Sequence, residues 1–438
     1  MKFLYQNTSL VNPKKLGANA SSLVEYVSHL KDVAEAGGYE ADESSINLPF
    51  DDSFYVDSSR FAEEKVTNTL KYILVVGIGG SNLGTKAVYD ATHGYTDILE
   101  KDRFPKIIFV DTLDTEFLLR LEKFINFEIA EPAEIIVNII SKSGGTTETM
   151  ANMEFVMGIL IKKFGDSVLG RLVITTDFDS LLWKEAGNKN ISRLGIPVKA
   201  GGRYSVFSNV GIFPLLCLGL DVKKLLEGAK EIRNKCLNEH FEDNPAMQSA
   251  IVLYENLKGG RVINDNFIFN SELESMGKWY RQLMGESLGK EKDLNGETIN
   301  TGITPTISIG STDLHSVGQL YLGGPKDKIT TFIYSETIPK NVEVPNERIF
   351  PNVVEIISGK SMKHIIRAIL DGVKASYGKG KLPFMEVVLD DISVHSLGQF
   401  MQFKMMEIMY LGRLMNVNAF DQPSVESYKT ETKQILES

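Results

Sequence analysis

Short, continuously apolar runs recur along the middle of the chain, and they constrain the fold more than any other feature. The first series comprises YILVVG (72–77), IIFVD (107–111), EIIVNIIS (134–141) and LVITTD (172–177), separated by stretches long enough for helices. Strands of this kind are buried on both faces, which is typical of a parallel sheet with helical connections. The pattern predicts a first α/β domain over residues 66–200.

A second series of apolar runs follows the first. It comprises DNFIFN (265–270), ITPTISIG (303–310), ITTFIYS (329–335) and FMEVVLD (384–390), again with helix-length material between several of them. The series predicts a second α/β domain over residues 261–392. Because strand, loop and helix follow in the same order in both halves, the pattern favours a duplicated fold.

The remaining parts of the chain are predicted to be helical. They are an N-terminal segment (1–65), a connection between the two α/β domains (201–260) and a C-terminal segment (393–438). The C-terminal segment is rich in methionine, and we expect it to pack in the core, where methionine fills irregular gaps. A chain of 438 residues is long enough for such an organisation, since domains commonly hold about 100–200 residues.

Charge and cysteine content exclude several classes of protein. The formal net charge is −10, so no global positive field attracts nucleic acid or an anionic membrane. The two cysteines, Cys217 and Cys236, do not form a metal-binding pair, and we expect both to be reduced thiols. The N-terminus lacks an apolar segment of signal-peptide length, and no run of about 18 apolar residues occurs. We therefore expect a cytoplasmic protein.

A glycine-rich loop, GIGGSNLGTK (77–86), directly follows the first apolar run. Glycines let the backbone approach a ligand closely, and the N-terminus of a following helix attracts a phosphate. The spacing does not fit a P-loop, because Lys86 is displaced, and Asn82 stands where a dinucleotide fingerprint needs its last glycine. Asp111 at the end of the next strand leaves a dinucleotide site open as an alternative. A tight strand-to-helix turn without a ligand is the other alternative.

A second polar loop, SKSGGTTET (141–149), follows the third apolar run. Its hydroxyls and glycines are the short donors and flexible backbone that a phosphate monoester needs, and it lies where α/β sheets bind ligands. The alternative is a helix cap within a polar loop. Because two donor-rich loops follow neighbouring strands, the sequence favours a shared phosphate site for a small phosphorylated metabolite.

Four further segments complete a recognisable set, namely GGRYS (201–205), QLMGESLGK (282–290), STDLHSVGQ (311–319) and FDQPSVESYK (420–429). Together with GIGGSNLG and SKSGGTTE, in this order and at about these spacings, they closely resemble the glucose-6-phosphate isomerase family in its shorter, bacterial form. The resemblance extends from about residue 71 to residue 429. Six segments in one order argue against a chance match.

The resemblance implies an aldose–ketose isomerase that interconverts glucose 6-phosphate and fructose 6-phosphate through a cis-enediolate, in glycolysis and gluconeogenesis. It also implies two doubly wound, mainly parallel sugar-isomerase (SIS) domains, and a reaction that needs neither a metal nor a cofactor. The family motifs make Glu286 the base that moves a proton between C2 and C1, a step suited to a positioned carboxylate. They make Arg203 the cation that stabilises the enediolate, because a guanidinium stays protonated. His315 and Lys429 match the pair assigned to ring opening.

The same resemblance implies the substrate contacts and the assembly. The matched positions are Gly80, Ser81, Ser141, Lys142, Ser143 and Thr146 for the phosphate and Gln422 near the sugar. For Lys142 we expect the backbone N–H to matter more than the side chain. The family is a homodimer in which His315 comes from the neighbouring subunit, and its partner molecule is a small sugar phosphate.

Three alternatives to this function remain open at the level of sequence. A sugar-phosphate-sensing protein would keep the phosphate loops without the chemistry, but Arg203, Glu286, His315 and Lys429 are all present. An NAD-dependent dehydrogenase would rest on the glycine loop and Asp111. A relaxed isomerase would also accept mannose 6-phosphate.

Overall fold

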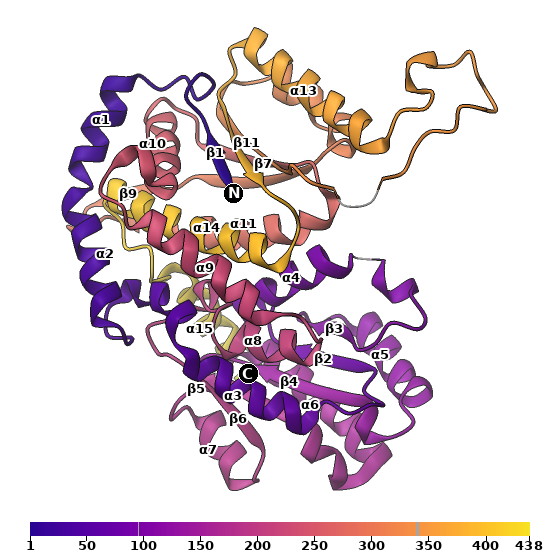
Figure 1. The fold of residues 1–438 in the computed structure, drawn as a ribbon. Helices are drawn as coiled ribbons and strands as arrows, with labels where there is room; N and C mark the ends of the chain where they lie inside the picture. The colour runs from indigo at the N-terminus through magenta and orange to yellow at the C-terminus, as the bar shows by residue number, and fades with distance from the viewer. Residues whose placement is uncertain (95, 339–340) are drawn as a thin grey trace.

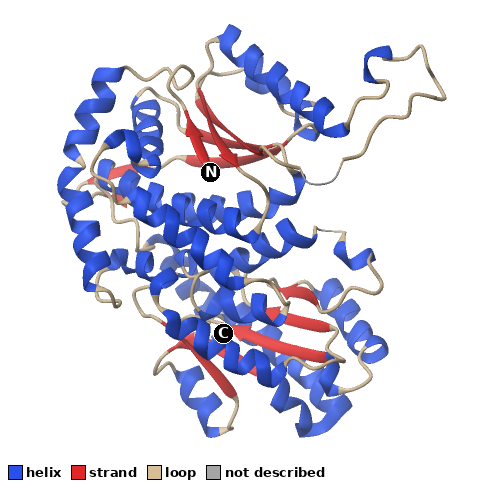
Figure 2. Ribbon diagram, viewed as in Figure 1, coloured by secondary structure: helices blue, strands red, loops and turns tan. Residues whose placement is uncertain are grey.

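The computed structural model describes residues 1–94, 96–338 and 341–438. It contains two α/β units, one above the other in Figure 1, with a layer of helices between them. Figure 2 shows the strands of the two units as separate groups on either side of this helical layer. The predicted α/β class with mainly parallel sheets is confirmed.

The sheet of the first unit is entirely parallel, with the spatial order β3-β2-β4-β5-β6. Every residue of its central strands is buried, which explains their unbroken apolar sequence. Helices cover both faces, with α3, α4 and α8 on one and α5, α6 and α7 on the other. The strands are β2 (Tyr72–Val76), β3 (Lys106–Val110), β4 (Ile135–Ile140), β5 (Leu172–Asp177) and β6 (Ser192–Ile196), and the helices are α3 (Asp52–Lys65), α4 (Leu83–His93), α5 (Thr115–Glu128), α6 (Thr147–Phe164), α7 (Leu181–Asn188) and α8 (Asn209–Cys217).

The sheet of the second unit has the order β1-β12-β11-β7-β10, in which β1 alone is antiparallel. One face packs on α12 and α13, and the other packs on the central helical layer. A small antiparallel pair, β8 (Lys290–Lys292) and β9 (Thr298–Thr301), lies outside this sheet. The sheet strands are β1 (Lys2–Leu4), β7 (Ile263–Ile268), β10 (Thr304–Ile309), β11 (Lys328–Ser335) and β12 (Phe384–Leu389), and the covering helices are α12 (Gly318–Gly323) and α13 (Met362–Gly380).

The central layer is built around α14 (Val394–Leu414), which is buried along nearly its whole length. It contains the methionine-rich stretch, so the expected core packing of that stretch is confirmed. Lys404 and Glu407 form an ion pair inside this layer, and Tyr280 and Ser249 donate hydrogen bonds to the carboxylate. The remaining α-helices of the described residues are α1 (Pro13–Ser22), α2 (Val24–Ala36), α9 (Val222–Cys236), α10 (Pro245–Lys258), α11 (Glu274–Leu288) and α15 (Ser424–Glu437).

The structure differs from the sequence expectation at four strands, because the antiparallel pair β8 and β9 was not expected either. The N-terminal segment, expected to be helical, begins with β1, which pairs with β12 at the edge of the second sheet. Strand β6 was not expected either, because its sequence SRLGI alternates weakly and contains a glycine. Strands β1 and β6 lie at sheet edges, and β8 and β9 pair with each other, so none of the four needs the continuous apolar sequence of a strand buried on both faces.

Two further findings bear on the sequence expectations. Cys217 and Cys236 are both buried free thiols. Within residues 1–94, 96–338 and 341–438, no helix combines the length and apolar character needed to cross a membrane.

Candidate active site

The two phosphate-type loops meet at one point of the first sheet. Strand β2 lies between β3 and β4, so the strand order of the sheet reverses between β2 and β4. Ligands of doubly wound sheets bind at the carboxyl ends of the strands at such a switch point. The glycine loop follows β2 and the SKSGGT loop follows β4, and a Cβ on Gly77 would lie 2.8 Å from the carbonyl oxygen of Ile140.

The glycine loop makes a short turn, Gly79–Ser81, before α4 begins. Gly79 has φ +61°, a conformation that favours glycine. A Cβ on Gly80 would lie 2.1 Å from the backbone carbon of Gly202, so the two backbones are in direct contact. Because Gly202 precedes Arg203, this contact places the arginine beside the turn Gly79–Ser81, which is called the phosphate-type turn below.

The second loop, after β4, is compact and partly self-bonded. Ser141 donates a hydrogen bond to the hydroxyl of Thr146 at 3.2 Å, and the hydroxyl of Ser143 accepts one from the backbone N–H of Gly145. The Lys142 side chain donates to the carbonyl oxygen of Val198. Burial lowers the pKa of Lys142. The side chain of Lys142 is therefore engaged with the protein.

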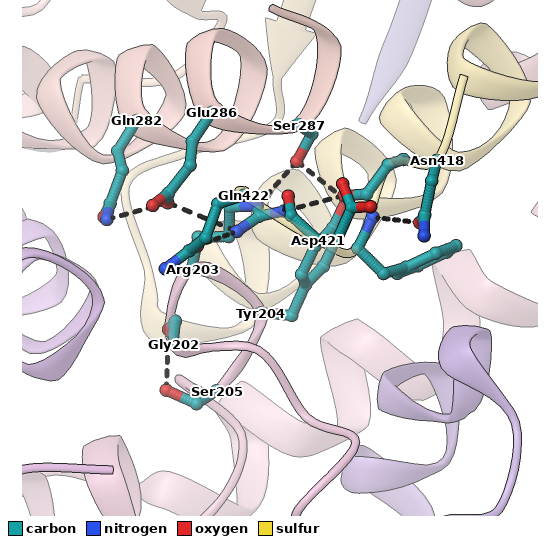
Figure 3. Close-up of polar contacts among 12 residues, drawn as sticks. Gly202, Arg203, Tyr204, Ser205, Gln282, Glu286, Ser287, Asn418, Asp421 and Gln422 are labelled. Carbon is teal, nitrogen blue, oxygen red and sulfur yellow. Dashed lines mark hydrogen bonds and ion pairs between the residues drawn. The ribbon is translucent and has the colours of Figure 1, made fainter. Parts of the chain in front are cut away.

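Arg203 is a buried charged group of the site with several hydrogen-bond acceptors. It is 2% exposed, and its Nε donates to Ser287 Oγ at 2.7 Å while its Nη2 donates to the carbonyl oxygens of Ala419 and Asp421. Its Nη1 donates to Gln422 Oε1 at 2.7 Å (Figure 3). These acceptors fix the guanidinium in one orientation, because its donors form a rigid planar fork.

Glu286 faces Arg203 from helix α11. Its Oε2 lies 3.3 Å from Arg203 Nη1, and its side chain is partly exposed while that of Arg203 is not. Gln282, one turn earlier on the same helix, donates to Glu286 Oε2 at 3.2 Å (Figure 3). Gln282 Nε2 also lies 3.0 Å from where a Cβ on Gly79 would stand, so it links the carboxylate with the phosphate-type turn.

The C-terminal loop is held against the site by Lys290 and Tyr204. Lys290 donates to the carbonyl oxygens of Glu286 and Asp421, and its ammonium lies 3.0 Å from Asp421 Oδ1. Tyr204 donates to the carbonyl oxygen of Ala419 at 3.3 Å. Burial lowers the pKa of Lys290 and raises the pKa of Tyr204.

The structure brings together some of the expected residues and not others. Arg203, Glu286 and Gln422 meet in one place, beside the loops that carry the expected phosphate residues. His315 is exposed after β10 in the second unit, and no side-chain bond to another described residue is recorded for it. Lys429 is exposed on α15 and pairs with Glu426 at 2.6 Å. Neither His315 nor Lys429 contacts Arg203 or Glu286 within this chain.

Sequence reasoning missed the residues that hold the site together. Gln282 stands four residues before Glu286, the spacing at which side chains meet on a helix, so its position was readable once the helix was assumed. Ser287, Tyr204, Lys290 and Asp421 lie within the family segments quoted above, but local sequence did not assign them a role. They meet only because loops that are distant in sequence fold onto one another.

A carboxylate and a buried guanidinium beside two donor-rich loops, at the switch point of a doubly wound sheet, define an enzyme class. Such a site has the groups needed to remove a proton and to stabilise the resulting anion on a small phosphorylated substrate. A sequence model of the phosphoglucose isomerase family matches residues 56–438, and the chain belongs to this family. The predicted identity as an aldose–ketose isomerase of this family is confirmed.

Individual relatives agree with this assignment. The chain is 33% identical over 381 residues to the glucose-6-phosphate isomerase of Carboxydothermus hydrogenoformans, covering 85% of this chain and 80% of that protein. It is 31% identical over 437 residues to a probable glucose-6-phosphate isomerase of Methanococcus maripaludis, covering 100% of this chain and 94% of the relative. The crystal structure of a hypothetical protein from Thermus thermophilus matches with a TM-score of 0.87 and 27% identity, over 100% of both chains.

Membership of the phosphoglucose isomerase family argues against a dinucleotide site at the glycine loop. The match spans that loop and the strand after it. In the structure, Asp111 accepts a hydrogen bond from Asn82 Nδ2 at 3.2 Å, so the carboxylate is tied to the loop itself.

Proposed function

We propose that this chain interconverts glucose 6-phosphate and fructose 6-phosphate at the site around Arg203, with Glu286 as the proton-transfer base. The observation that carries the proposal is the position of Glu286 Oε2, 3.3 Å from Arg203 Nη1 and hydrogen-bonded to Gln282, which lies against the turn Gly79–Ser81. A substrate anchored by its phosphate would then present its other end to the carboxylate. Holding the reacting carbon beside a fixed base converts proton removal into an effectively unimolecular step.

The phosphate is bound in this proposal by the two loops at the switch point. The turn Gly79–Ser81 contributes Gly80 and the Ser81 hydroxyl, and the loop after β4 contributes Ser141, Lys142, Ser143 and Thr146. Thr146 is the N-cap residue of α6, and its side chain makes no capping bond, so the first N–H groups of that helix are available to an anion. For Lys142 the backbone N–H is the donor, because the side chain is engaged with Val198.

Arg203 stabilises the enediolate oxygen in this proposal. Its Nε and Nη2 donors point to Ser287, Ala419 and Asp421, which leaves Nη1 as the end that faces Glu286. A substrate oxygen that enters between the two side chains would receive the Nη1 hydrogen that now faces the carboxylate. The guanidinium does not have to reorient to make this hydrogen bond, so no free energy is lost in reorganisation as negative charge develops on the substrate oxygen.

Ring opening is assigned to His315 and Lys429, and this assignment implies a homodimer. Both side chains are exposed in the single chain, and among the described residues neither has a hydrogen bond or ion pair with Arg203 or Glu286. We infer that His315 of the partner subunit enters the site, and that Lys429 approaches as α15 packs on its surroundings in the assembled enzyme. We also propose a cytoplasmic location, as expected for an enzyme of central sugar metabolism.

The first test of the proposal is a coupled assay with fructose 6-phosphate that follows the formation of glucose 6-phosphate. Glu286→Gln keeps the shape and hydrogen bonds of the side chain but removes the base, so kcat should fall by about 10²- to 10⁴-fold. Glu291→Gln, an exposed glutamate nearby, is the matched control and should keep normal turnover. Near-normal turnover by Glu286→Gln would refute the base assignment, and sugar-phosphate binding without turnover by the unmodified chain would favour the sensing alternative.

A mixing experiment tests the origin of His315. Glu286→Gln and His315→Ala are each expected to be inactive, but a mixed dimer would hold one site with both intact residues. An equal mixture of the two variants, unfolded and refolded together, should recover about a quarter of the normal activity. Failure to recover activity from well-folded mixed dimers would show that His315 does not act across an interface.

A further inference from the structure

The second α/β unit repeats the strand order of the first. The order β3-β2-β4-β5 in the first sheet corresponds to β10-β7-β11-β12 in the second, with every one of these strands parallel. The switch point of the second sheet therefore lies between β7 and β11. Doubly wound sheets bind ligands at the carboxyl ends of such strands.

A recess of about 100 Å³ lies at this switch point in the second sheet. Its walls come from residues after β7, residues at the end of β11 and one side of α13, which lies along the upper unit in Figure 1. The volume is below the range of about 300–1,000 Å³ that is usual for pockets holding drug-sized ligands. The recess therefore suits a small ligand.

The floor of the recess is polar and internally hydrogen-bonded. Asn270 follows β7 and Ser335 ends β11, and both are buried. Asn270 Oδ1 accepts from the backbone N–H of Ser335 at 2.8 Å, and Asn270 Nδ2 donates to Ser335 Oγ at 3.1 Å. Because Ser335 Oγ accepts this bond, its own hydrogen remains available to donate to a ligand.

The wall formed by α13 is positively charged. Lys363 and Arg367 are four residues apart, so they lie on one face of the helix, and both line the recess. Lys363 has no recorded ion pair with any residue that the structure describes. Arg367 lies 4.7 Å from the centroid of the Tyr334 ring and has Asp371 as an exposed partner at 3.4 Å.

The one acidic side chain on the wall, Glu336, is already paired. Its two carboxylate oxygens accept hydrogen bonds from Lys2 at 3.0 and 3.1 Å. The charge that faces a ligand in the recess is therefore supplied by Lys363 and Arg367. The remaining wall is apolar, including Ile366 and Leu370.

We propose that this recess is a second ligand site, which binds a small anion, a phosphate or a short carboxylate, through Lys363, Arg367 and Ser335. The site has no carboxylate free to act as a base and no glycine turn against a second backbone. It is therefore a binding site without the chemistry of the first unit. Charge-assisted hydrogen bonds from a guanidinium and an ammonium are the contacts that recognise both phosphate and carboxylate groups.

Isothermal titration of the full chain tests this proposal and separates the two kinds of anion. The first site is filled beforehand with an equilibrated mixture of fructose 6-phosphate and glucose 6-phosphate, and inorganic phosphate or acetate is then titrated to about 10 mM, the range of weak binding. We expect saturable binding of one equivalent of one of these anions per chain. The anion that binds more tightly identifies the group the recess prefers.

Substitutions on α13 locate the bound anion. Lys363→Ala and Arg367→Ala should each weaken its binding about tenfold, as expected for loss of a hydrogen bond to a charged group. Lys379→Ala removes a lysine from the far end of the same helix, away from the recess, and should leave the affinity unchanged. All three positions are exposed, and thermal melts monitored by circular dichroism verify that the variants fold.

Two results would overturn the proposal. One is the absence of saturable binding of either anion up to about 10 mM. The other is binding of equal strength in the unmodified chain and in the Lys363→Ala/Arg367→Ala double variant. A crystal structure of the unmodified chain grown in phosphate gives an independent readout, since the proposal requires density for an anion between Ser335 and α13.

Discussion

The switch points of the two sheets share their topology but differ in the residues that come after equivalent strands. After β2 the chain turns through glycines, and Gly80 touches the backbone of Gly202. After β7 it continues through Phe269 and Asn270, whose side chains line the recess. The two sheets therefore share a switch point, but the first combines it with a glycine turn in contact with a second backbone, and the second combines it with larger side chains.

The difference extends to the charged groups. In the first unit the guanidinium of Arg203 is buried and has its donors fixed by Ser287 on α11 and by the C-terminal loop at residues 419–422. In the second unit the cations Lys363 and Arg367 stand exposed on one helix. A preorganised cation stabilises a transition state, while an exposed one supports reversible binding. The comparison indicates that duplication of a fold does not duplicate its chemistry.

The largest effect on activity is expected from adding a side chain where Gly80 contacts Gly202. Gly80→Ala would place a methyl group 2.1 Å from the backbone carbon of Gly202, so the two segments must move apart. We expect kcat/KM to fall by about 10³-fold, since a displacement of about 1 Å in one group alone can cost about 100-fold. Gly372→Ala in α13, where a Cβ meets nothing within 4 Å, should retain full activity in the same assay. If Gly80→Ala were equally active, the glycine turn would not distinguish the two units.

A smaller effect is expected from Arg203→Lys, which keeps the charge but removes the planar fork. A lysine cannot reach Ser287, Ala419 and Gln422 together, so the cation loses its fixed position. We expect kcat to fall by about 10²-fold with a smaller change in KM, as for loss of one preorganised donor. Arg281→Lys on the neighbouring exposed position of α11 is the control. A normal kcat in Arg203→Lys would show that charge alone suffices.

Gln282→Leu should lower kcat by less than the two preceding substitutions. The change removes the hydrogen bond to Glu286 Oε2 and a polar contact beside Gly79. We expect kcat to fall about tenfold, the factor for a hydrogen bond to a charged group, together with a changed pH profile of kcat. Gln282→Glu tests the same position with a second carboxylate, which should shift that profile further. Unchanged profiles in both variants would show that Gln282 does not position the base.

The smallest effect is expected at the carboxyl ends of β5 and β12, on stability rather than activity. Burial raises the pKa of Asp177 to about 6, against the opposing charge of Lys142. The unfolded carboxyl has a pKa near 3.9, so between about pH 4 and pH 6 the folded state holds this proton more tightly. The contribution of Asp177 to the free energy of unfolding therefore decreases as pH rises through that window and is constant above it.

Asp177→Asn should remove this pH dependence. After allowance for partial exposure, we expect the variant to be about 1 kcal/mol more stable at pH 7, measured by denaturant unfolding at pH 4.5 and pH 7. Asp390→Asn is the matched control after β12, where the carboxylate is mostly exposed and pairs with the N-terminal amine of Met1 at 2.9 Å. Its effect should be at most about 1 kcal/mol, in the destabilising direction. An unchanged pH dependence in Asp177→Asn would contradict the role of burial at Asp177.

The apolar strands of the two large sheets were more predictable than the shorter or more polar strands. The eight apolar runs all became strands, including the partly exposed edge strands β3 and β10. Strands β1, β6, β8 and β9 were missed, since a strand that pairs with one neighbour needs no continuous apolar sequence. In the site, roles were predicted for Glu286 and Arg203, whereas Gln282 and Lys290 lie in the same quoted segment as Glu286 but had no predicted role.

The sequence by itself determined the class of fold, the family and the chemical types of residue available for a proton transfer on a sugar phosphate. Local pattern is sufficient for these because strand burial, glycine turns and family motifs are each encoded within a few neighbouring residues. Only the tertiary structure decided that Gly80 meets Gly202, that Arg203 is locked by the C-terminal loop, and that the second sheet carries a cationic recess. These features depend on contacts between residues far apart in the chain, and their geometry follows from packing rather than from local sequence.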